Sequence, residues 1–369
     1  MKQTHLTKLL LISTSITSLS LASLNASALT GASFDTVGPH TNTGNTNVAG
    51  NPYDPSVIGI NVGVNQAGDT SLNNSGQVVF SGDIDRQLDT SAYHNYVGIN
   101  FWRALDVDYA GAAGNTTLTN SGEMSGEITV TNIKRGAIDG HLAVHGIFMG
   151  AYTDGSQTYT IDNSGKMNIK VTSNEQQADT SGVTNAVDNP SSDQYLLGIA
   201  MSSGGNLSQK TTNGVLEKNL QGQHTAKISN TGEIILNNVI NSTANAIAAN
   251  AYTYGINLGA ANMKDVTITN SGTFNVTSTS TTNDKGLAEA SGILFNDFNY
   301  EKSDLSDIAF NPTGALDVNI ENSNAFKVDA QGKIAATATG INVITRSTDR
   351  ASRNINIINK TPTTAGSKI

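Results

Sequence analysis

A three-part pattern of apolar and polar positions repeats along this chain and is clearest between Tyr254 and Val276. Its first part is Gly-Ile-x-apolar, in which the Ile and the residue two places later are both apolar. That two-residue period predicts a strand with one buried face. The tetrapeptide occurs seven times: Gly59–Val62, Gly98–Phe101, Gly146–Met149, Gly198–Met201, Gly255–Leu258, Gly292–Phe295 and Gly340–Val343.

The second part is an aliphatic residue two places before an Asn. In five repeats this Asn leads into Ser-Gly or Thr-Gly, and Asn324 takes the Gly position in another. Because Gly and Asn both tolerate positive φ, we expect a sharp turn of that kind here. A third part, such as Phe274 and Val276, then resumes the alternation. The aliphatic/Asn pairs are Leu72/Asn74, Leu118/Asn120, Ile161/Asn163, Ile228/Asn230, Ile268/Asn270, Ile320/Asn322 and Ile357/Asn359.

The distance between successive repeats is irregular, because polar inserts separate otherwise constant strands. The clearest inserts are Thr172–Asp193, Ser202–His224 and Asn296–Gly314. Constant strands with variable loops predict a solenoid. Coils stacked at the strand spacing of ~4.8 Å would hydrogen-bond to one another and align their inward apolar residues in columns. The predicted fold class is therefore all-β, a parallel β-helix of about seven three-stranded coils over residues 57–360.

Two other all-β folds are the alternatives. A β-propeller blade needs four antiparallel strands, usually with periodic aromatic residues. A β-sandwich gives no reason for one motif to recur seven times. The recurring motif favours the β-helix over both.

The two ends of the chain lack the repeat. Residues 1–28 are typical of a secretory signal peptide, with Lys2 and Lys8, an apolar run over Leu9–Leu24 and cleavage expected after Ala28. The run is short for a transmembrane anchor of ~20 apolar residues. Residues 29–56 are rich in Gly, Asn and Pro and predict an extended lead-in or N-terminal cap. Residues 361–369, with Pro362 where a third strand would begin, predict a frayed or truncated tail.

Composition narrows the possible partners. Only 14% of the residues are charged, and the chain contains no Cys, so no disulfide framework holds it together. Without Lys2 and Lys8, 19 of the 21 basic residues remain against 30 acidic ones, a formal charge of −11. This acidic balance argues against a nucleic-acid partner. No later stretch is long and apolar enough to predict a transmembrane helix in the mature chain.

The recurring coil resembles that of bacterial autotransporter passenger domains. The residues that carry the resemblance are Thr267–Phe274, Thr117–Gly122 and Lys227–Ile234, each built on Thr/Ser-Asn-Ser/Thr-Gly. The resemblance implies a right-handed parallel β-helix on the Gram-negative cell surface or secreted from it, and many members are adhesins. It covers residues 57–360 and the signal peptide, and its motif implies fold and export route far better than activity.

One feature departs from that family. A complete autotransporter ends in a membrane β-barrel built from alternating strands of roughly ten residues. Here the repeat reaches Lys360-Thr361-Pro362 without such a series. We expect either a truncated chain or a passenger that is secreted or held by a separate outer-membrane translocator.

The repeated Asn column has two interpretations. It could be a ladder that binds a ligand. It could equally be structural, since stacked Asn side chains satisfy one another's amides across successive coils. We favour the structural interpretation, because Asn has a reason to occupy a turn without any ligand.

Two histidines and two acidic clusters are the candidates for site chemistry. His141 and His145 would pair around zinc on a helix, but on the expected strand they lie ~13 Å apart, too far to share a metal. Asp106 and Asp108 would share one strand face, as glycoside cleavage requires of two carboxylates. However, the surroundings lack clustered basic residues, so a solvated acidic loop is favoured. The second cluster contains Asp83, Asp85, Arg86 and Asp89.

The sequence therefore predicts no catalytic, cofactor-binding or metal-binding residue and no cofactor. The favoured function is that of a non-enzymatic passenger, in adhesion or surface interaction, with a host-surface protein or glycan as ligand. Its long inserts would carry recognition, since loops on a rigid scaffold tolerate variation. The alternatives are a polysaccharide lyase or hydrolase and a purely structural surface component.

Overall fold

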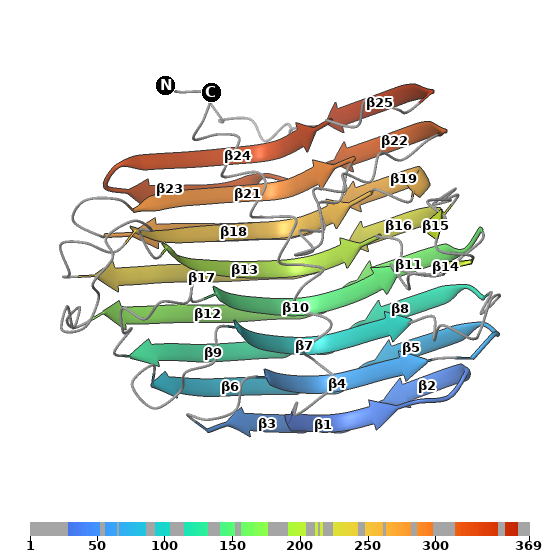
Figure 1. Ribbon diagram of the computed structural model, residues 1–369, viewed down its shortest axis with the longest axis horizontal. Coiled ribbons are helices and arrows are strands. Elements are labelled where there is room, and N and C mark those ends of the chain that lie inside the picture. The colour runs from blue at the N-terminus through green and yellow to red at the C-terminus, as the bar shows by residue number, and fades with distance from the viewer. Residues whose placement is uncertain are drawn as a thin grey trace.

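In the computed structural model the chain winds through three parallel β-sheets (Figure 1). We describe residues 29–51, 56–64, 66–85, 93–103, 114–131, 141–151, 156–175, 191–203, 211–212, 215–216, 224–242, 248–260, 263–281, 286–297, 314–345 and 351–360. Each turn of the chain places one strand in sheet A, one in sheet B and one in sheet C, except the last described turn, which has strands in sheets A and B alone. The predicted all-β parallel β-helix is confirmed.

Sheets A and B each have eight strands, and sheet C has seven. In sheet A these are β1 (Leu29–Phe34), β4 (Ser56–Val64), β7 (Tyr93–Arg103), β10 (His141–Ala151), β13 (Ser191–Ser202), β18 (Ala248–Gly259), β21 (Leu287–Asn296) and β24 (Ala335–Ile344). In sheet B they are β2 (Gly38–Asn42), β5 (Thr70–Asn74), β8 (Thr116–Asn120), β11 (Thr158–Asn163), β16 (His224–Asn230), β19 (Met263–Asn270), β22 (Ala315–Asn322) and β25 (Ser352–Asn359). In sheet C they are β3 (Thr46–Gly50), β6 (Val78–Asp85), β9 (Met124–Thr131), β12 (Lys166–Glu175), β17 (Glu233–Ser242), β20 (Thr273–Ser280) and β23 (Phe326–Gly332). Two short antiparallel strands, β14 (Thr211–Thr212) and β15 (Val215–Leu216), lie apart from these sheets.

The seven sequence repeats correspond to the coils that begin with β4, β7, β10, β13, β18, β21 and β24. An additional coil, β1–β3, precedes them and pairs in parallel register with β4, β5 and β6. This coil lies within residues 29–56, for which the sequence predicted an extended lead-in or an N-terminal cap. These strands contain few apolar side chains. They are held by backbone hydrogen bonds to the next coil, along the one edge of each strand that is paired. Ala32 and Phe34 pack against the core as the end of the stack.

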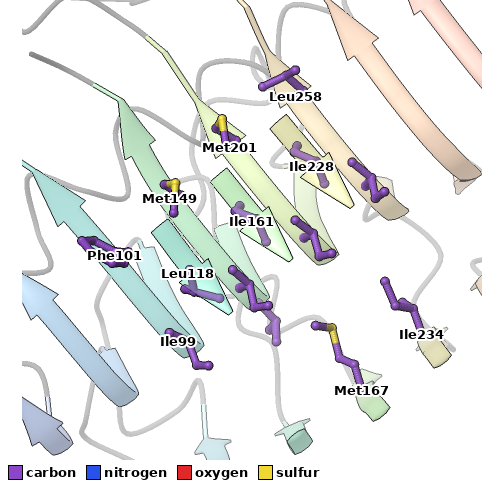
Figure 2. Packing of buried hydrophobic residues seen from close by; sticks show 14 of the residues in the cluster. Ile99, Phe101, Leu118, Met149, Ile161, Met167, Met201, Ile228, Ile234 and Leu258 are labelled. Carbon is purple, nitrogen blue, oxygen red and sulfur yellow. The ribbon is translucent and has the colours of Figure 1, made fainter. Parts of the chain in front are cut away.

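The main core fills the space between the three sheets. Register aligns like residues of successive coils, such as Phe101, Met149, Met201 and Leu258 in sheet A. Figure 2 shows this column facing residues of sheet B and sheet C. The sheet B residues in that view are Leu118, Ile161 and Ile228, and those of sheet C are Met167 and Ile234. All are buried, so the predicted apolar columns are confirmed.

Glycine is needed in the Asn-Ser-Gly turn for a different reason from the one expected. Among the described glycines, positive φ occurs at Gly38, Gly68 and Gly314, none of which lies in this turn. Instead the turns of successive coils stack very closely. A Cβ on Gly122 would lie 1.9 Å from the carbonyl oxygen of Gly76 in the preceding coil. Close backbone approach, and not an unusual φ, excludes a side chain there.

This stacking can be tested with two matched alanine variants. Gly122→Ala should lower the free energy of unfolding by about 1–3 kcal/mol, since the added methyl overlaps a backbone carbonyl. Gly44 occupies the same turn position in the first coil, where a Cβ would meet nothing within 4 Å. Gly44→Ala should therefore be neutral or slightly stabilising. Guanidinium unfolding checks both, and equal effects would contradict the stacking explanation.

Candidate functional site

The Asn column forms a continuous ladder of side-chain hydrogen bonds. The Nδ2 of each Asn donates to the Oδ1 of the Asn in the next coil at 2.7–2.8 Å, from Asn42 through to Asn359. The same Nδ2 contacts the carbonyl oxygen two residues on, as in Asn120 to Gly122 at 3.4 Å. Interior members are buried and use both ends of the amide within the stack. The structural interpretation of this column is confirmed.

Removing one interior rung should be costly. Asn163→Ala leaves the Asn230 Oδ1 without its donor and the Asn120 Nδ2 without its main acceptor. Each buried group left unsatisfied costs about 1–3 kcal/mol, so we expect a loss of at least about 2 kcal/mol in unfolding free energy. Asn42→Ala, at the end of the ladder, removes a single rung, the bond to Asn74, together with the 3.4 Å contact with the Gly44 carbonyl, and should cost less. The opposite ranking in guanidinium unfolding would be inconsistent with the ladder.

Sheet A differs from the other two sheets because its strands between the two edge strands β1 and β24 are buried on both faces. In sheets B and C, buried residues alternate with exposed or half-exposed ones, as in β8 and β16. In β21 every residue after Leu287 is buried. The expectation of one buried face per Gly-Ile strand is therefore wrong. The outward side chains form a second apolar group, called here the outer cluster: Ile58, Val97, Ala143, Phe148, Tyr195, Leu197, Ala200, Tyr252, Tyr254 and Leu294.

The repeated Gly of the Gly-Ile motif changes the phase of each sheet A strand. Leu196 and Ile199 both point into the main core although three residues apart, and Gly198 lies between them. A Cβ on Gly198 would come within 2.5 Å of the carbonyl oxygen of Gly255. The residues before this bend, Tyr195 and Leu197, consequently face outward. The glycine thus positions the aromatic residues of the outer cluster.

Polar groups accompany the aromatic rings of the outer cluster. Tyr195 and Tyr252 stack with centroids 4.7 Å apart and an interplanar angle of 14°. The hydroxyl of Tyr254 donates to Oε1 of Glu289 at 3.2 Å. Asn250 donates to Oδ1 of Asp193 at 2.8 Å. Three adjacent strands, β13, β18 and β21, therefore bring tyrosines and carboxylates onto one sheet face.

Burial perturbs the titration of these groups. Burial raises the pKa of Glu289, and the hydrogen bond from Tyr254 opposes that shift. Burial, together with the nearby charges of Asp193 and Glu289, raises the pKa of Tyr195 and of Tyr252. On β10, burial alone lowers the pKa of His145 to about 3. Each shift disfavours the charged form, as expected for groups removed from water.

Several polar atoms of this face have no hydrogen-bond partner within the described part of the chain. They are the hydroxyl oxygens of Tyr195, Tyr252 and Ser291, and Oδ1 of Asn257. Buried polar atoms are normally paired, as the Asn ladder shows. The outer face of sheet A therefore contains buried polar atoms that the described chain leaves without a hydrogen bond.

The same face is poorly arranged for glycoside cleavage. Asp193 and Glu289 lie two strands and two residues apart by register. That separation corresponds to about 12 Å from strand and residue spacings. Retaining and inverting glycosidases hold their carboxyls roughly 5–9.5 Å apart. The backbone positions of this pair are therefore farther apart than the carboxyl separation of either class.

Only some of the candidates taken from the sequence lie within the described residues. His141 and His145 lie on strand β10, as expected. Asp83 is exposed on sheet C, and Asp85 ends the same strand β6. Arg86, Asp89, Asp106 and Asp108 lie outside the described residues. Among the described side chains, no group of three or more His, Asp or Glu could hold a metal ion.

The residues of the outer cluster were missed by sequence reasoning, although a signal exists. Tyr195, Tyr252 and Glu289 each stand three positions before the Gly of a Gly-Ile motif. Their register confirms that they form one column. This three-residue offset can be seen in the sequence. It was not interpreted, because each strand was expected to have only one buried face.

Comparison with known proteins gave no relatives: no protein family, curated protein or solved structure matches the chain. In the part of the chain that is described, there is no helix of the length and hydropathy needed to cross a membrane.

The charge state of Glu289 should be visible in stability. Its pKa is raised in the folded protein, so stability is lost as pH rises above the ordinary value of 4.5. Glu289→Gln removes that penalty and can still accept from Tyr254. We expect the variant to be more stable than the parent at pH 7 and equal to it below pH 4.5, as measured by unfolding between pH 4 and 8. Glu233→Gln, on the exposed face of sheet C, serves as the control. A Glu289→Gln variant less stable than the parent at pH 7 would refute the assignment.

Proposed function

We propose that this chain is an exported, non-enzymatic surface rod of the autotransporter-passenger type, displayed on the outer membrane or secreted. It acts in adhesion, with a host-surface protein or glycan as ligand. The parallel β-helix, the signal-like residues 1–28 and the recurring Asn-Ser-Gly coil support this proposal.

One observation supports a role in recognition. The connections between strands vary in length at two corners of the coil, A to B and C to A, but not at the third, B to C. Connections from sheet B to sheet C are uniformly short, as at 121–123 and 271–272. Those from sheet A to sheet B range from 260–262 to 203–223, and those from sheet C to sheet A range from 333–334 to 176–190. Both variable corners border sheet A. Variation is thus concentrated around one face, where recognition loops on a scaffold are expected.

Replacing the long connections should abolish adhesion without disturbing the rod. Ser203 and His224 are buried, so only residues 204–223 are exchanged, for the Ala-Asn found at 261–262 of the next coil. Residues 298–313 are exchanged in the same way. Latex beads coated with the double variant should bind cultured epithelial cells and immobilised mucin at least tenfold less than beads with the parent chain. The far-UV β signal should stay unchanged.

Two controls sharpen this experiment. Lys170→Ala, on the exposed face of sheet C, should leave bead binding intact. Periodate oxidation of the cells separates a glycan ligand from a protein ligand. Undiminished binding by the double variant rejects the loop assignment, and no binding by the parent chain rejects adhesion to these surfaces.

A second candidate, a structural component that assembles end to end, has one observation in its favour. The exposed large hydrophobics among the described residues are Leu29 in the first coil and Ile334, Ile357 and Ile358 in the last. Open strand edges with apolar residues favour association. Pro39 on edge strand β2 weighs against it, since it offers no N–H to an incoming strand. Concentration-dependent light scattering by a parent chain that fails to adhere would favour this candidate.

A further inference from the structure

His145 occupies an unusual position on the outer face of sheet A. It lies on β10, and its register partners on β7 and β13 are Val97 and Leu197. The residue is 2% exposed, and its ring meets that of Phe148 edge-on at a centroid distance of 5.3 Å. Neither ring nitrogen has a hydrogen-bond partner in the described chain. The imidazole is therefore packed as an apolar ring.

No described carboxylate on this face is placed to compensate a charge on His145. On β13, Asp193 lies four residues before Leu197, about 13 Å along the strand. Glu289 lies three strands away on β21, about 14 Å across the sheet. The other titratable residues of the face are Tyr195, Tyr252 and Tyr254, which stay neutral.

The neighbouring strands add no partner either. On β7, Tyr96 belongs to the main core, and His94 pairs in register with Leu142 of that core. Tyr93 and Arg103 stand at the two ends of β7, and His141 begins β10 itself. Each is at least four residues from the level of His145, or about 13 Å. Within the described part of the chain, an imidazolium at this position would be a buried cation without a counter-ion.

We propose that acid opens the outer face of sheet A, with protonation of His145 as the trigger. This rests on the geometry of the face and is independent of the proposed adhesion. Protons bind the open form, in which the ring reaches water, more tightly than the closed form. The pKa of His145 falls from 6.5 to about 3 on burial, so the closed form loses stability as pH falls from 6.5 towards 3.

The response should be local and directional. Phe148, Tyr195 and Leu197 surround His145 and would be uncovered, giving the rod an apolar aromatic surface in acid. Glu289 responds in the opposite sense, because its raised pKa favours the closed, protonated carboxyl at low pH. Acid therefore destabilises the closed form of the face at β10 and β13 and stabilises it at β21.

Hydroxyl-radical footprinting of the purified chain tests this. The opening constant gains up to tenfold per pH unit, so oxidation of Phe148 and Tyr195 should rise by up to ~100-fold between pH 6.5 and 4.5. Tyr159 and Phe274 of the main core, both 0% exposed, should stay protected. A flat profile for Phe148, or parallel oxidation of Tyr159 and Phe274, overturns the proposal, the latter because it indicates global unfolding.

Two variants assign the response to His145. His145→Leu suits a column that already contains Val97 and Leu197, and should abolish the pH dependence. His40→Leu, in the first coil on sheet B, should leave it intact. An unchanged acid response in His145→Leu overturns the trigger assignment. Should that variant fail to fold, His145→Met provides the same comparison, and the pH profile of the parent chain still decides whether opening occurs.

Discussion

Parallel pairing of each coil with the next is the constraint on which the whole molecule depends. It holds successive strands about 4.8 Å apart, so every residue lies directly over its register partner. A residue type that can stack on itself is therefore favoured at each position. The Asn ladder satisfies this with directional amide bonds, and the Gly columns satisfy it by admitting a backbone carbonyl. Apolar columns satisfy it by simple packing.

The same constraint explains why the three sheets are not equivalent. Sheets B and C meet at a short turn fixed by the ladder, and their outer faces remain accessible and polar. Sheet A is joined to both neighbours by connections of variable length. In each strand of sheet A, the Gly bend interrupts the alternation of inward and outward residues. The outer face of sheet A collects the residues that depart most from a simple repeat, among them His145, Tyr252 and Glu289.

Those departures carry an electrostatic cost that a purely structural rod would avoid. Burial disfavours the charged forms of Glu289 and His145, and several hydroxyl groups nearby lack partners in the described chain. In sheet B, by contrast, the buried Asn side chains satisfy one another through the ladder. The electrostatic cost of burial is therefore largest on the outer face of sheet A.

The sequence by itself determined the fold, because a two-residue apolar period and a recurring Asn turn require strands of fixed register. The sevenfold recurrence of segments such as Gly255–Leu258 and Ile268–Asn270 led to that conclusion. The first coil, β1–β3, was missed because it lacks the Gly-Ile motif and has few apolar residues, although Asn42-Thr43-Gly44 repeats the Asn turn. The outer cluster was missed for a different reason. Tyr195, Tyr252 and Glu289 are separated by long connections, and only the stacking of coils brings them onto one face.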